Sequence, residues 1–327
     1  MKRLATVLAA AGLTLAVGST AGAAELKKMT IATGVDPAFS QFYVAKESGI
    51  FEKNGLDVSV NTGPSGSAMV AFLIGNQVHA AYGSENAGVL NNQVDDRVVT
   101  VGEGTFLKRW LSVVANEQIK TVEDLKGKRV GVAQATGSET FWLSVLKNLD
   151  LKAEDYQVVN VEAPEMVAAL ERGNIDAFSV WEPWPTRAVM SVQGAKILLD
   201  NEGFLNLRNL VFMNRDWIEE NPETAEAFML SMVQATELIN DDREAATQMV
   251  ADFLRMPIEL ATELMPKLDF NMDLNDGTME NIATVEAQLK QIGKLQKDLD
   301  WDNFVYPDLL KKVAPERVTY TSIPPKM

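Results

Sequence analysis

The chain has 327 residues, with 45 Asp and Glu residues against 30 Lys and Arg residues, a formal net charge of −15 and no cysteine. The lack of cysteine excludes disulfide bonds, thiolate zinc sites and cysteine nucleophiles, and the single histidine, His79, excludes a metal motif with two histidines. The acidic balance argues against binding to nucleic acid or an anionic membrane, because both select basic surfaces.

The first 24 residues have the pattern of a cleavable signal peptide. Lys2 and Arg3 precede an apolar run at residues 4–17, and the small residues at 19–24 include Ala21-Gly22-Ala23, which matches the A-x-A cleavage pattern. The run is shorter than the roughly 20 residues of a spanning helix. We expect export, with the charge changing from −15 to −17 as two positive charges are lost. No cysteine is present to carry a lipid anchor, and the alternative is an uncleaved N-terminal anchor.

From residue 29 to residue 115, short strand-like runs alternate with stretches of helical spacing. This alternation is typical of βαβ units, so we expect a mainly parallel sheet covered by helices. The predicted strands are residues 29–33, 56–60, 78–82, 98–101 and 111–115, and the predicted helices are residues 41–54 and 67–74.

A second unit of the same kind begins at Thr121. Together with Asp124, three residues later, Thr121 resembles a helix capping box. Strands and helices then alternate as before, which predicts a second α/β unit. The predicted strands are residues 129–133, 157–161, 175–180 and 195–199, and the predicted helices are residues 139–149 and 166–171.

After a predicted strand at residues 209–213 the chain becomes helical. Asn221-Pro222-Glu223 is a strong helix start, with a cap residue, a proline at the first position and an acid in the first turn. Apolar stripes in this region are typical of helices that cover a core. Further helices are predicted around residues 243–254, 257–265 and 275–295.

An internal repeat relates the two units. When residues 69–85 are shifted by 97 positions they fall on residues 166–182, and both copies read as helix, glycine-containing turn, strand and Glu. We therefore expect two lobes of the same topology, with Glu85 and Glu182 at equivalent places beyond the carboxyl ends of strands, where such sheets bind ligands. The identical residues are Met69/Met166, Val70/Val167, Ala71/Ala168, Leu73/Leu170, Ala80/Ala177 and Glu85/Glu182.

Five segments carry a resemblance to a known family. They are FYVAKESGIFEKNGLDV at residues 42–58, GPSGS at 63–67, TVEDLKGKRVGV at 121–132, GNIDA at 173–177 and WEPW at 181–184. With them the chain resembles the solute-binding proteins of ABC importers, in the nitrate/sulfonate/taurine branch that also includes thiamine-pyrimidine-precursor binders.

The resemblance implies a type II periplasmic-binding-protein fold. This is an α/β, two-lobed fold with parallel-rich sheets, two hinge crossovers and extra C-terminal helices. The resemblance assigns residues 25–115 and 210–327 to lobe 1 and residues 116–209 to lobe 2, and it implies that the ligand is held in the cleft between the lobes.

Three turns that precede predicted helices offer polar groups to a ligand in that cleft. They lie at residues 36–41, 64–67 and 135–139, where backbone N–H groups, hydroxyls and the helix dipole favour an anion. For each Ser and Thr the alternative is ordinary N-capping. The candidate contacts in these turns are Phe39, Ser40, Gln41, Ser65, Gly66, Ser67, Thr136, Gly137 and Ser138.

The ends of the two repeated strands supply Ser84, Glu85, Trp181 and Glu182 as further candidates. Trp181 can cover one face of a ligand, and the alternative is packing between the lobes. An acid at the cleft repels an anion and favours an ammonium group, so a zwitterion such as taurine reconciles the acids with the helix starts. The alternative is that both acids are exposed or paired with basic side chains.

The resemblance implies a monomeric periplasmic protein that captures a small organic or inorganic anion or zwitterion of the sulfonate, taurine or nitrate type. It delivers this solute to an ABC-transporter permease and ATPase complex at the inner membrane, with no catalysis, cofactor, metal or nucleic acid involved. The alternatives are a binder of a thiamine-pyrimidine-like or aromatic solute, an enzyme on the same fold, and an extracytoplasmic sensor.

Overall fold

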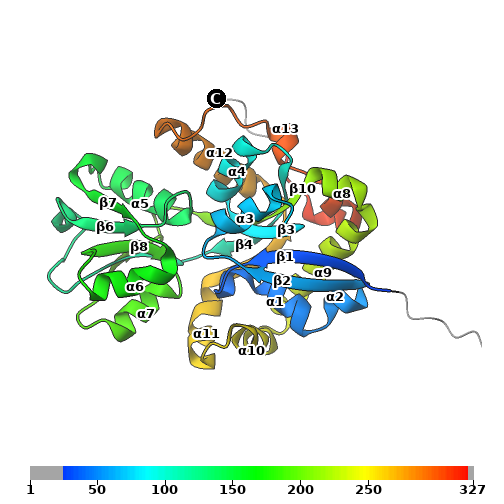
Figure 1. Ribbon diagram of the computed structural model, residues 1–327, viewed down its shortest axis with the longest axis horizontal. Helices are drawn as coiled ribbons and strands as arrows, with labels where there is room; N and C mark the ends of the chain where they lie inside the picture. Colours follow the sequence, from blue (N-terminus) through cyan, green and yellow to red (C-terminus); the bar gives the residue numbers. More distant parts are fainter. Residues whose placement is uncertain (1–24, 323–327) are drawn as a thin grey trace, which may run out of the picture.

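Two β-sheets organise the molecule (Figure 1). The computed structural model describes residues 25–322, so the signal peptide predicted at residues 1–24 lies outside the described residues. We refer to each sheet, with the helices that contact it, as the A half and the B half. Sheet A comprises β1 (Lys27–Thr33), β2 (Leu56–Thr62), β3 (Ala80–Ser84), β4 (Val98–Leu107), β10 (Leu207–Asn214) and β11 (Leu268–Asp273), and sheet B comprises β5 (Leu111–Ala115), β6 (Arg129–Val132), β7 (Gln157–Asn160), β8 (Ala177–Trp181) and β9 (Lys196–Asp200).

Each sheet contains a set of three parallel strands. The order of sheet A is β11-β4-β10-β3-β1-β2, and β1 is parallel to both β2 and β3, so Ile31 pairs with Val60 on one side and with Ala80 on the other. In sheet B, ordered β7-β6-β8-β5-β9, β6 is parallel to β7 and β8. The remaining strands pair antiparallel. The predicted α/β class is confirmed, and both sheets are mixed where these further strands join.

The internal repeat coincides with repeated structure. Helix α3 (Gly66–Ile74) and strand β3 are followed by Glu85, and helix α6 (Ala163–Glu171) and strand β8 are followed by Glu182. The first and last residues of α3 and β3 are each 97 positions before the first and last residues of α6 and β8, the same shift as in the sequence repeat. The predicted equivalence of the two α/β units therefore holds for these elements.

The helices of the A half form two groups around sheet A (Figure 1). One group packs around α9, whose predicted stripe of Phe228, Met232, Ala235 and Ile239 is fully buried, and Phe228 contacts the ring of Phe42 edge-on at 5.9 Å. This group contains α1 (Ser40–Glu47), α2 (Ile50–Lys53), α9 (Pro222–Asp241), α10 (Arg243–Leu254) and α14 (Asp308–Val313). The other contains α3, α4 (Glu85–Val94) and α12 (Asp276–Gln291), and the remaining helices of this half are α8 (Arg215–Glu220), α11 (Ile258–Leu264) and α13 (Trp301–Phe304).

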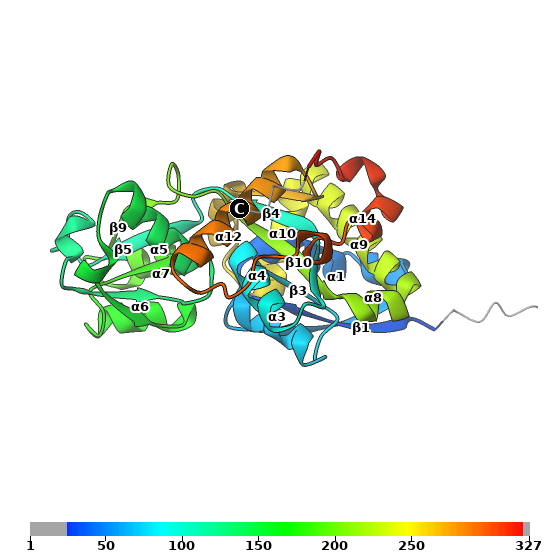
Figure 2. The same cartoon turned by 90° about the horizontal axis from the view of Figure 1, so that it is seen from above.

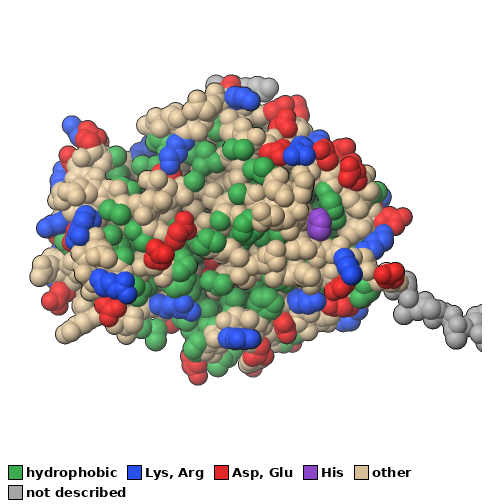
Figure 3. Space-filling model, viewed as in Figure 1, with side chains coloured by type: hydrophobic (Ala, Val, Ile, Leu, Met, Phe, Trp, Pro, Cys, Tyr) green, Lys and Arg blue, Asp and Glu red, His purple; other side chains and the backbone are tan. Residues whose placement is uncertain are grey.

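In the B half, α5 (Gly137–Asn148), α6 and α7 (Trp184–Ser191) contact sheet B. Figure 2 shows the same division from above, with the elements of sheet B at one end of the molecule. Acidic and basic side chains are interspersed over the face seen in Figure 3. Within residues 25–322, no helix is both long enough and apolar enough to span a membrane.

Several elements differ from the sequence-based expectation. The single helix predicted at residues 41–54 is wrong, because Gly49 adopts a positive φ of 71° and separates α1 from α2. Helix α4 was not predicted, since its sequence contains three Asn and one Gly, which are poor helix formers. Burial of most of its residues and the Ser84 cap stabilise it instead. Helices α7 and α8 and strand β11 were also missed.

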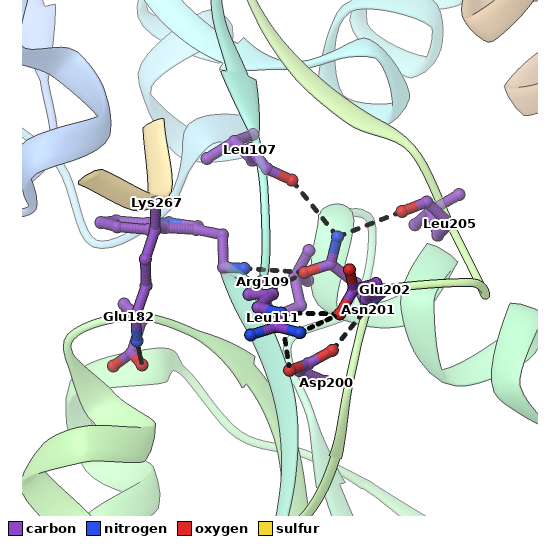
Figure 4. A network of polar contacts seen from close by, with 10 residues as sticks. Leu107, Arg109, Leu111, Glu182, Asp200, Asn201, Glu202, Leu205 and Lys267 are labelled. Carbon is purple, nitrogen blue, oxygen red and sulfur yellow. Dashed lines mark hydrogen bonds and ion pairs between the residues drawn. The ribbon is translucent and has the colours of Figure 1, made fainter. Parts of the chain in front are cut away.

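The chain passes between the sheets twice, at residues 108–110 and 201–206, and we call these two segments together the hinge. The buried side chain of Asn201 joins them (Figure 4). Its Oδ1 accepts hydrogen bonds from the amides of Trp110 (2.7 Å) and Leu111 (2.9 Å), and its Nδ2 donates to the carbonyls of Leu107 (3.2 Å) and Leu205 (3.1 Å). Strand β5, residues 111–115, belongs to sheet B, whereas the sequence-based division assigned these residues to lobe 1. That division into lobes stays a prediction.

Candidate functional site

A cavity that is partly open to solvent lies between the two halves, and its empty space, open solvent included, is about 570 Å³. Both sheets contribute to it at the strand ends that face the hinge, as expected for ligand sites in open α/β sheets. Among residues 25–322, no group of three or more His, Asp or Glu side chains is placed to hold a metal ion. The cavity is lined by Gly34, Val35, Asp36, Phe39, Gly63, Pro64, Ser65, Gly66, Met69, Ser84, Leu107, Trp110, Thr136, Gly137, Trp181, Trp184, Leu207 and Asn209.

Three helices begin at the cavity, and the side chain that caps each of them lines it. Ser65 caps α3 by accepting from the amide of Ala68, and Ser84 caps α4 by accepting from the amide of Ala87, both at 3.4 Å. Thr136 caps α5 in the B half. Because the first amides of a helix lack partners within the helix, these starts aim N–H groups and the positive ends of helix dipoles at the cavity.

Close approach of the chain at the cavity depends on two glycines. A Cβ atom on Gly34 would lie 2.4 Å from the ring of Phe39, so only glycine fits the turn after β1. A Cβ atom on Gly137 would lie 2.9 Å from Leu207, which belongs to the other half. A side chain at either position would require its neighbours to move, and at Gly137 it would press the two halves apart.

Aromatic side chains form the apolar wall of the cavity. Phe39 comes from the A half and packs against the ring of Tyr82 with centroids 5.4 Å apart. Trp110, Trp181 and Trp184 come from the hinge and the B half. Such rings offer apolar contact to a carbon chain and an electron-rich face to a cation. The cavity therefore combines polar helix starts with an aromatic wall.

Among the residues of 25–322 that line the cavity, Asp36 is the one that carries a charged side chain. Only 3% of it is exposed, and its Oδ1 accepts a hydrogen bond from the amide of Ala38 at 2.9 Å. Burial raises the pKa of the Asp36 carboxyl to about 7, against the smaller opposing effect of that hydrogen bond. The hydroxyl of Tyr43 fixes the turn by donating to the backbone carbonyls of Gly34 and Asp36.

The basic side chains that neighbour the cavity wall in sequence are engaged elsewhere. Lys108 forms an ion pair with Asp269 at 2.9 Å, and Arg109 pairs with Glu202 in the hinge (Figure 4). Arg208 pairs with the buried carboxylate of Glu103 at 2.8 Å, and Arg187 stacks on Trp184 with its guanidinium 4.9 Å from the ring centroid. Helix starts, rather than basic side chains, are therefore the positive features of the wall within residues 25–322.

The structure brings seven of the thirteen candidate residues to the cavity. They are Phe39, Ser65, Gly66, Ser84, Thr136, Gly137 and Trp181. Three of the other six have buried side chains that donate hydrogen bonds to the backbone. Ser67 is half-buried and does not line the cavity. Ser40 donates to the carbonyl of Pro37 at 2.6 Å, Gln41 donates to Gly104 at 2.5 Å, and Ser138 donates to Ser179 at 2.6 Å. These residues position the helix starts, and ligand contact by any candidate stays a prediction.

Glu85 and Glu182 follow equivalent strands but do not line the cavity. Glu85 accepts from the amide of Arg208 (3.0 Å) and the side chain of Asn281 (3.1 Å), and burial raises its pKa to about 7. Glu182 is fully buried and pairs with Lys267 at 2.9 Å. The alternative that the acids pair with basic side chains therefore holds for Glu182. Its partner, Lys267, is distant from it in sequence.

Sequence reasoning missed much of the wall. Asp36 stood in the predicted turn at residues 36–41, and its place directly after a strand was a usable signal. Trp184 belongs to the WEPW segment but was not among the candidate contacts. Asn209 and Leu207 lie on β10, and nothing in their local sequence distinguishes them from other strand residues. Their place beside the cavity results from the long-range pairing of β10 with β3 and β4.

Within residues 25–322, three polar contacts between side chains of one half and groups of the other join the halves. Asn86 of α4 donates to the carbonyl of Thr136 at 3.0 Å. Lys267, which precedes β11, pairs with Glu182, and Lys294 pairs with Glu139 of α5 at 2.6 Å. These contacts link segments from the two sheets and hold the halves together in the conformation that the structure describes.

Comparison with known proteins gives a family match and named relatives. The sequence profile of the NMT1-like family matches residues 22–254. A protein of Escherichia coli strain K12, with the provisional name aliphatic-sulfonates-binding protein, is 25% identical over 304 residues, which are 92% of each chain. The taurine-binding periplasmic protein of the same organism is 29% identical over 223 residues, covering 65% of this chain and 66% of the relative.

Among solved structures, the chain is similar to the alkanesulfonate-binding protein SsuA of Xanthomonas axonopodis pv. citri bound to MOPS. The TM-score is 0.77 at 18% sequence identity, and the match covers 87% of this chain and 100% of the other. At this identity the similarity concerns the fold alone. It confirms the periplasmic-binding-protein fold that the sequence resemblance implied.

Proposed function

The chain belongs to the NMT1-like family, and from this premise we propose that it is the periplasmic substrate-binding protein of an ABC importer. It captures a small anion or zwitterion of the sulfonate, taurine or nitrate type in the cavity between its two halves. Two of its relatives are named for aliphatic sulfonates and for taurine, which supports this class of solute.

The observation that carries the proposal is the convergence of three capped helix starts on one cavity. Ser65 and Ser84 reach it from the A half and Thr136 from the B half. An anion placed between them accepts hydrogen bonds from both halves at once, and the helix dipoles offset its charge without a basic side chain. Simultaneous contact with both halves is what a protein that closes on its solute requires.

The aromatic wall supports an organic solute over a bare inorganic ion. Phe39, Trp110 and Trp181 offer a large apolar area, which nitrate cannot use but the carbon chain of a sulfonate can. We therefore place organic sulfonates ahead of nitrate as the solute.

Binding works by a shift between open and closed arrangements of the halves. Solute that touches helix starts from both halves favours the closed form, because only that form brings Thr136 close to Ser65 and Ser84. No bond is made or broken in this scheme, and release requires only reopening at the permease. In this scheme Asp36 and the hydroxyls of Ser65, Ser84 and Thr136, which line the cavity, serve binding.

Isothermal titration calorimetry of the purified protein against alkanesulfonates, taurine, nitrate and a pyrimidine precursor tests the proposal. We expect saturable binding of at least one organic sulfonate, near the micromolar range of about −8 kcal/mol, and recovery of the unaltered solute by mass spectrometry. Binding of none of the anions, or conversion of a bound solute to product, would contradict it. The transport role is tested by uptake of the bound solute in cells with and without the gene.

A further inference from the structure

Asp36 lines the cavity, and within residues 25–322 its carboxyl group forms no ion pair. Its Oδ1 accepts from the amide of Ala38. Within residues 25–322 no hydrogen bond to Oδ2 is formed, and this oxygen is not among the fully enclosed unpaired polar atoms. The basic side chains that flank the wall are paired with Asp269, Glu202 and Glu103 or stacked on Trp184. Asp36 is therefore a nearly buried acid that forms no ion pair within the described residues 25–322.

Such an arrangement is unfavourable unless something else completes it. A buried carboxylate without a counter-charge loses much of its hydration, and this cost of the charged form is why burial raises the pKa of Asp36. The chain nevertheless fixes this carboxyl firmly, because Tyr43 holds the turn and the side chain of Asp36 caps the short helix at residues 37–39. A group fixed at a cavity wall with one free oxygen is placed to contact what enters the cavity.

A solute that carries only a negative charge gives the Asp36 carboxylate no partner. The carboxylate repels such a solute, while the helix starts at Ser65, Ser84 and Thr136 attract it. A solute with an anionic end and a cationic end satisfies both features, and the electron-rich faces of Trp110, Trp181 and Trp184 also favour the cationic end. An approaching cation lowers the pKa of a carboxyl group, so binding itself favours the ionised acid.

We propose that Asp36 is a specificity-determining residue that binds the cationic group of the solute, so that the protein selects amino-substituted sulfonates over alkanesulfonates of the same size. This inference rests on the proposed function and refines its solute class. The sulfonate end lies at the helix starts and the ammonium end at Asp36. The carbon chain between them packs against the aromatic wall.

Two pairs of matched probes test the assignment by calorimetry. Taurine and propane-1-sulfonate differ only in an ammonium group against a methyl group, and 3-aminopropanesulfonate and butane-1-sulfonate form the same kind of pair one methylene longer. We expect the wild type to bind the better amino compound at least about tenfold more tightly than its alkyl partner, because a charge-assisted hydrogen bond is lost in the latter.

The variant Asp36→Asn keeps an oxygen to accept from Ala38 but removes the charge, and we expect it to lose most of this preference. The control Asp57→Asn alters an exposed acid on β2, outside the wall, and we expect it to keep the preference. Equal or tighter binding of the alkyl compounds by the wild type would overturn the inference while leaving the proposed function intact. An unchanged preference in a folded Asp36→Asn protein would also overturn it. If no member of either pair binds, the sulfonate function itself fails.

Discussion

Asp36 and Glu85 are buried carboxyl groups whose pKa burial raises to about 7. They differ in their surroundings, since Asp36 lines the cavity, whereas Glu85 does not and accepts hydrogen bonds from the backbone of Arg208 and the side chain of Asn281. Glu103 raises the pKa of Glu85 further and Arg208 opposes the rise. Glu85 is therefore a structural acid whose protonation is coupled to folding.

The sign of this coupling follows from the direction of the shift. The pKa of Glu85 in the folded protein lies above the ordinary value of 4.5, so the folded state binds this proton more tightly than the unfolded chain. Its contribution to stability is present in full below about pH 4.5 and is lost as the pH rises through 7. The free energy of unfolding is measured in urea at pH 5 and at pH 8. Between these values we expect the wild type to lose up to about 3 kcal/mol more stability than Glu85→Gln.

The matched control is Glu47→Gln, because Glu47 is exposed at the end of α1. This variant should follow the wild type at both pH values. An equal pH dependence in the wild type and in Glu85→Gln would show that Glu85 does not titrate with folding in this range.

Sequence reasoning at the residue scale was most informative for local roles. Ser65 and Thr136 cap helices within three residues of themselves, so their place at helix starts could be predicted from short patterns. Gln41 and Glu182 take part in contacts with Gly104 and Lys267, which are 63 and 85 positions away. No local pattern specifies such partners, and the roles of these two residues therefore became visible only in the fold.

At the scale of elements, the start of α5 both stabilises a helix and lines the cavity. Thr136 Oγ1 accepts from the amide of Ser138 at 3.1 Å and donates to the carbonyl of Ala133 at 2.7 Å. We expect Thr136→Ala to destabilise the protein by about 1 kcal/mol, as loss of a cap does, and to weaken solute binding severalfold as well. Thermal unfolding and calorimetric titration measure the two effects.

Asn275→Ala separates capping from binding. Asn275 caps α12 through the amide of Thr278 at 3.0 Å, in a helix that begins away from the cavity. A comparable loss of stability with unchanged affinity is expected for this variant. If both variants weaken binding to the same extent, the effect of Thr136 arises from general destabilisation and not from its place at the cavity.

Elements were predictable where the sequence pattern and the final environment agree. The repeated units α3–β3 and α6–β8 have apolar strands and glycine-containing turns, and they were found with their equivalence. Helix α4 was missed because its Asn residues favour turns in isolation, while in the fold Asn91 and Asn92 are buried and donate to backbone carbonyls. Tertiary contacts thus stabilise helix α4, although its local sequence does not favour a helix.

At the scale of the whole molecule, the ion pair between Lys267 and Glu182 joins the two halves beside the hinge (Figure 4). The side chain of Glu182 is 1% exposed and that of Lys267 is 26% exposed, so removing the lysine leaves a buried carboxylate with only Thr186 as a hydrogen-bond donor among residues 25–322. Because separation of the halves lets water reach Glu182, we expect Lys267→Met to favour the open form.

The expected result is a solute affinity weaker by about tenfold, because only the closed fraction binds tightly, and a larger radius of gyration by small-angle X-ray scattering. Lys311→Met is the control, since Lys311 forms a weak exposed pair with Asp308 within α14. An affinity equal to that of the wild type in the Lys267 variant would mean that this ion pair does not bias closure.

The side chain of Asn201 has a mechanical consequence. It bonds both crossing segments of the hinge, through the amides of Trp110 and Leu111 and the carbonyls of Leu107 and Leu205. Two unconnected segments would allow the halves to twist, slide and bend against each other. Because Asn201 bonds both segments, we expect them to move together, which restricts the relative motion of the halves. A restricted closing motion would present the outer surfaces of the two halves to the permease in a defined arrangement.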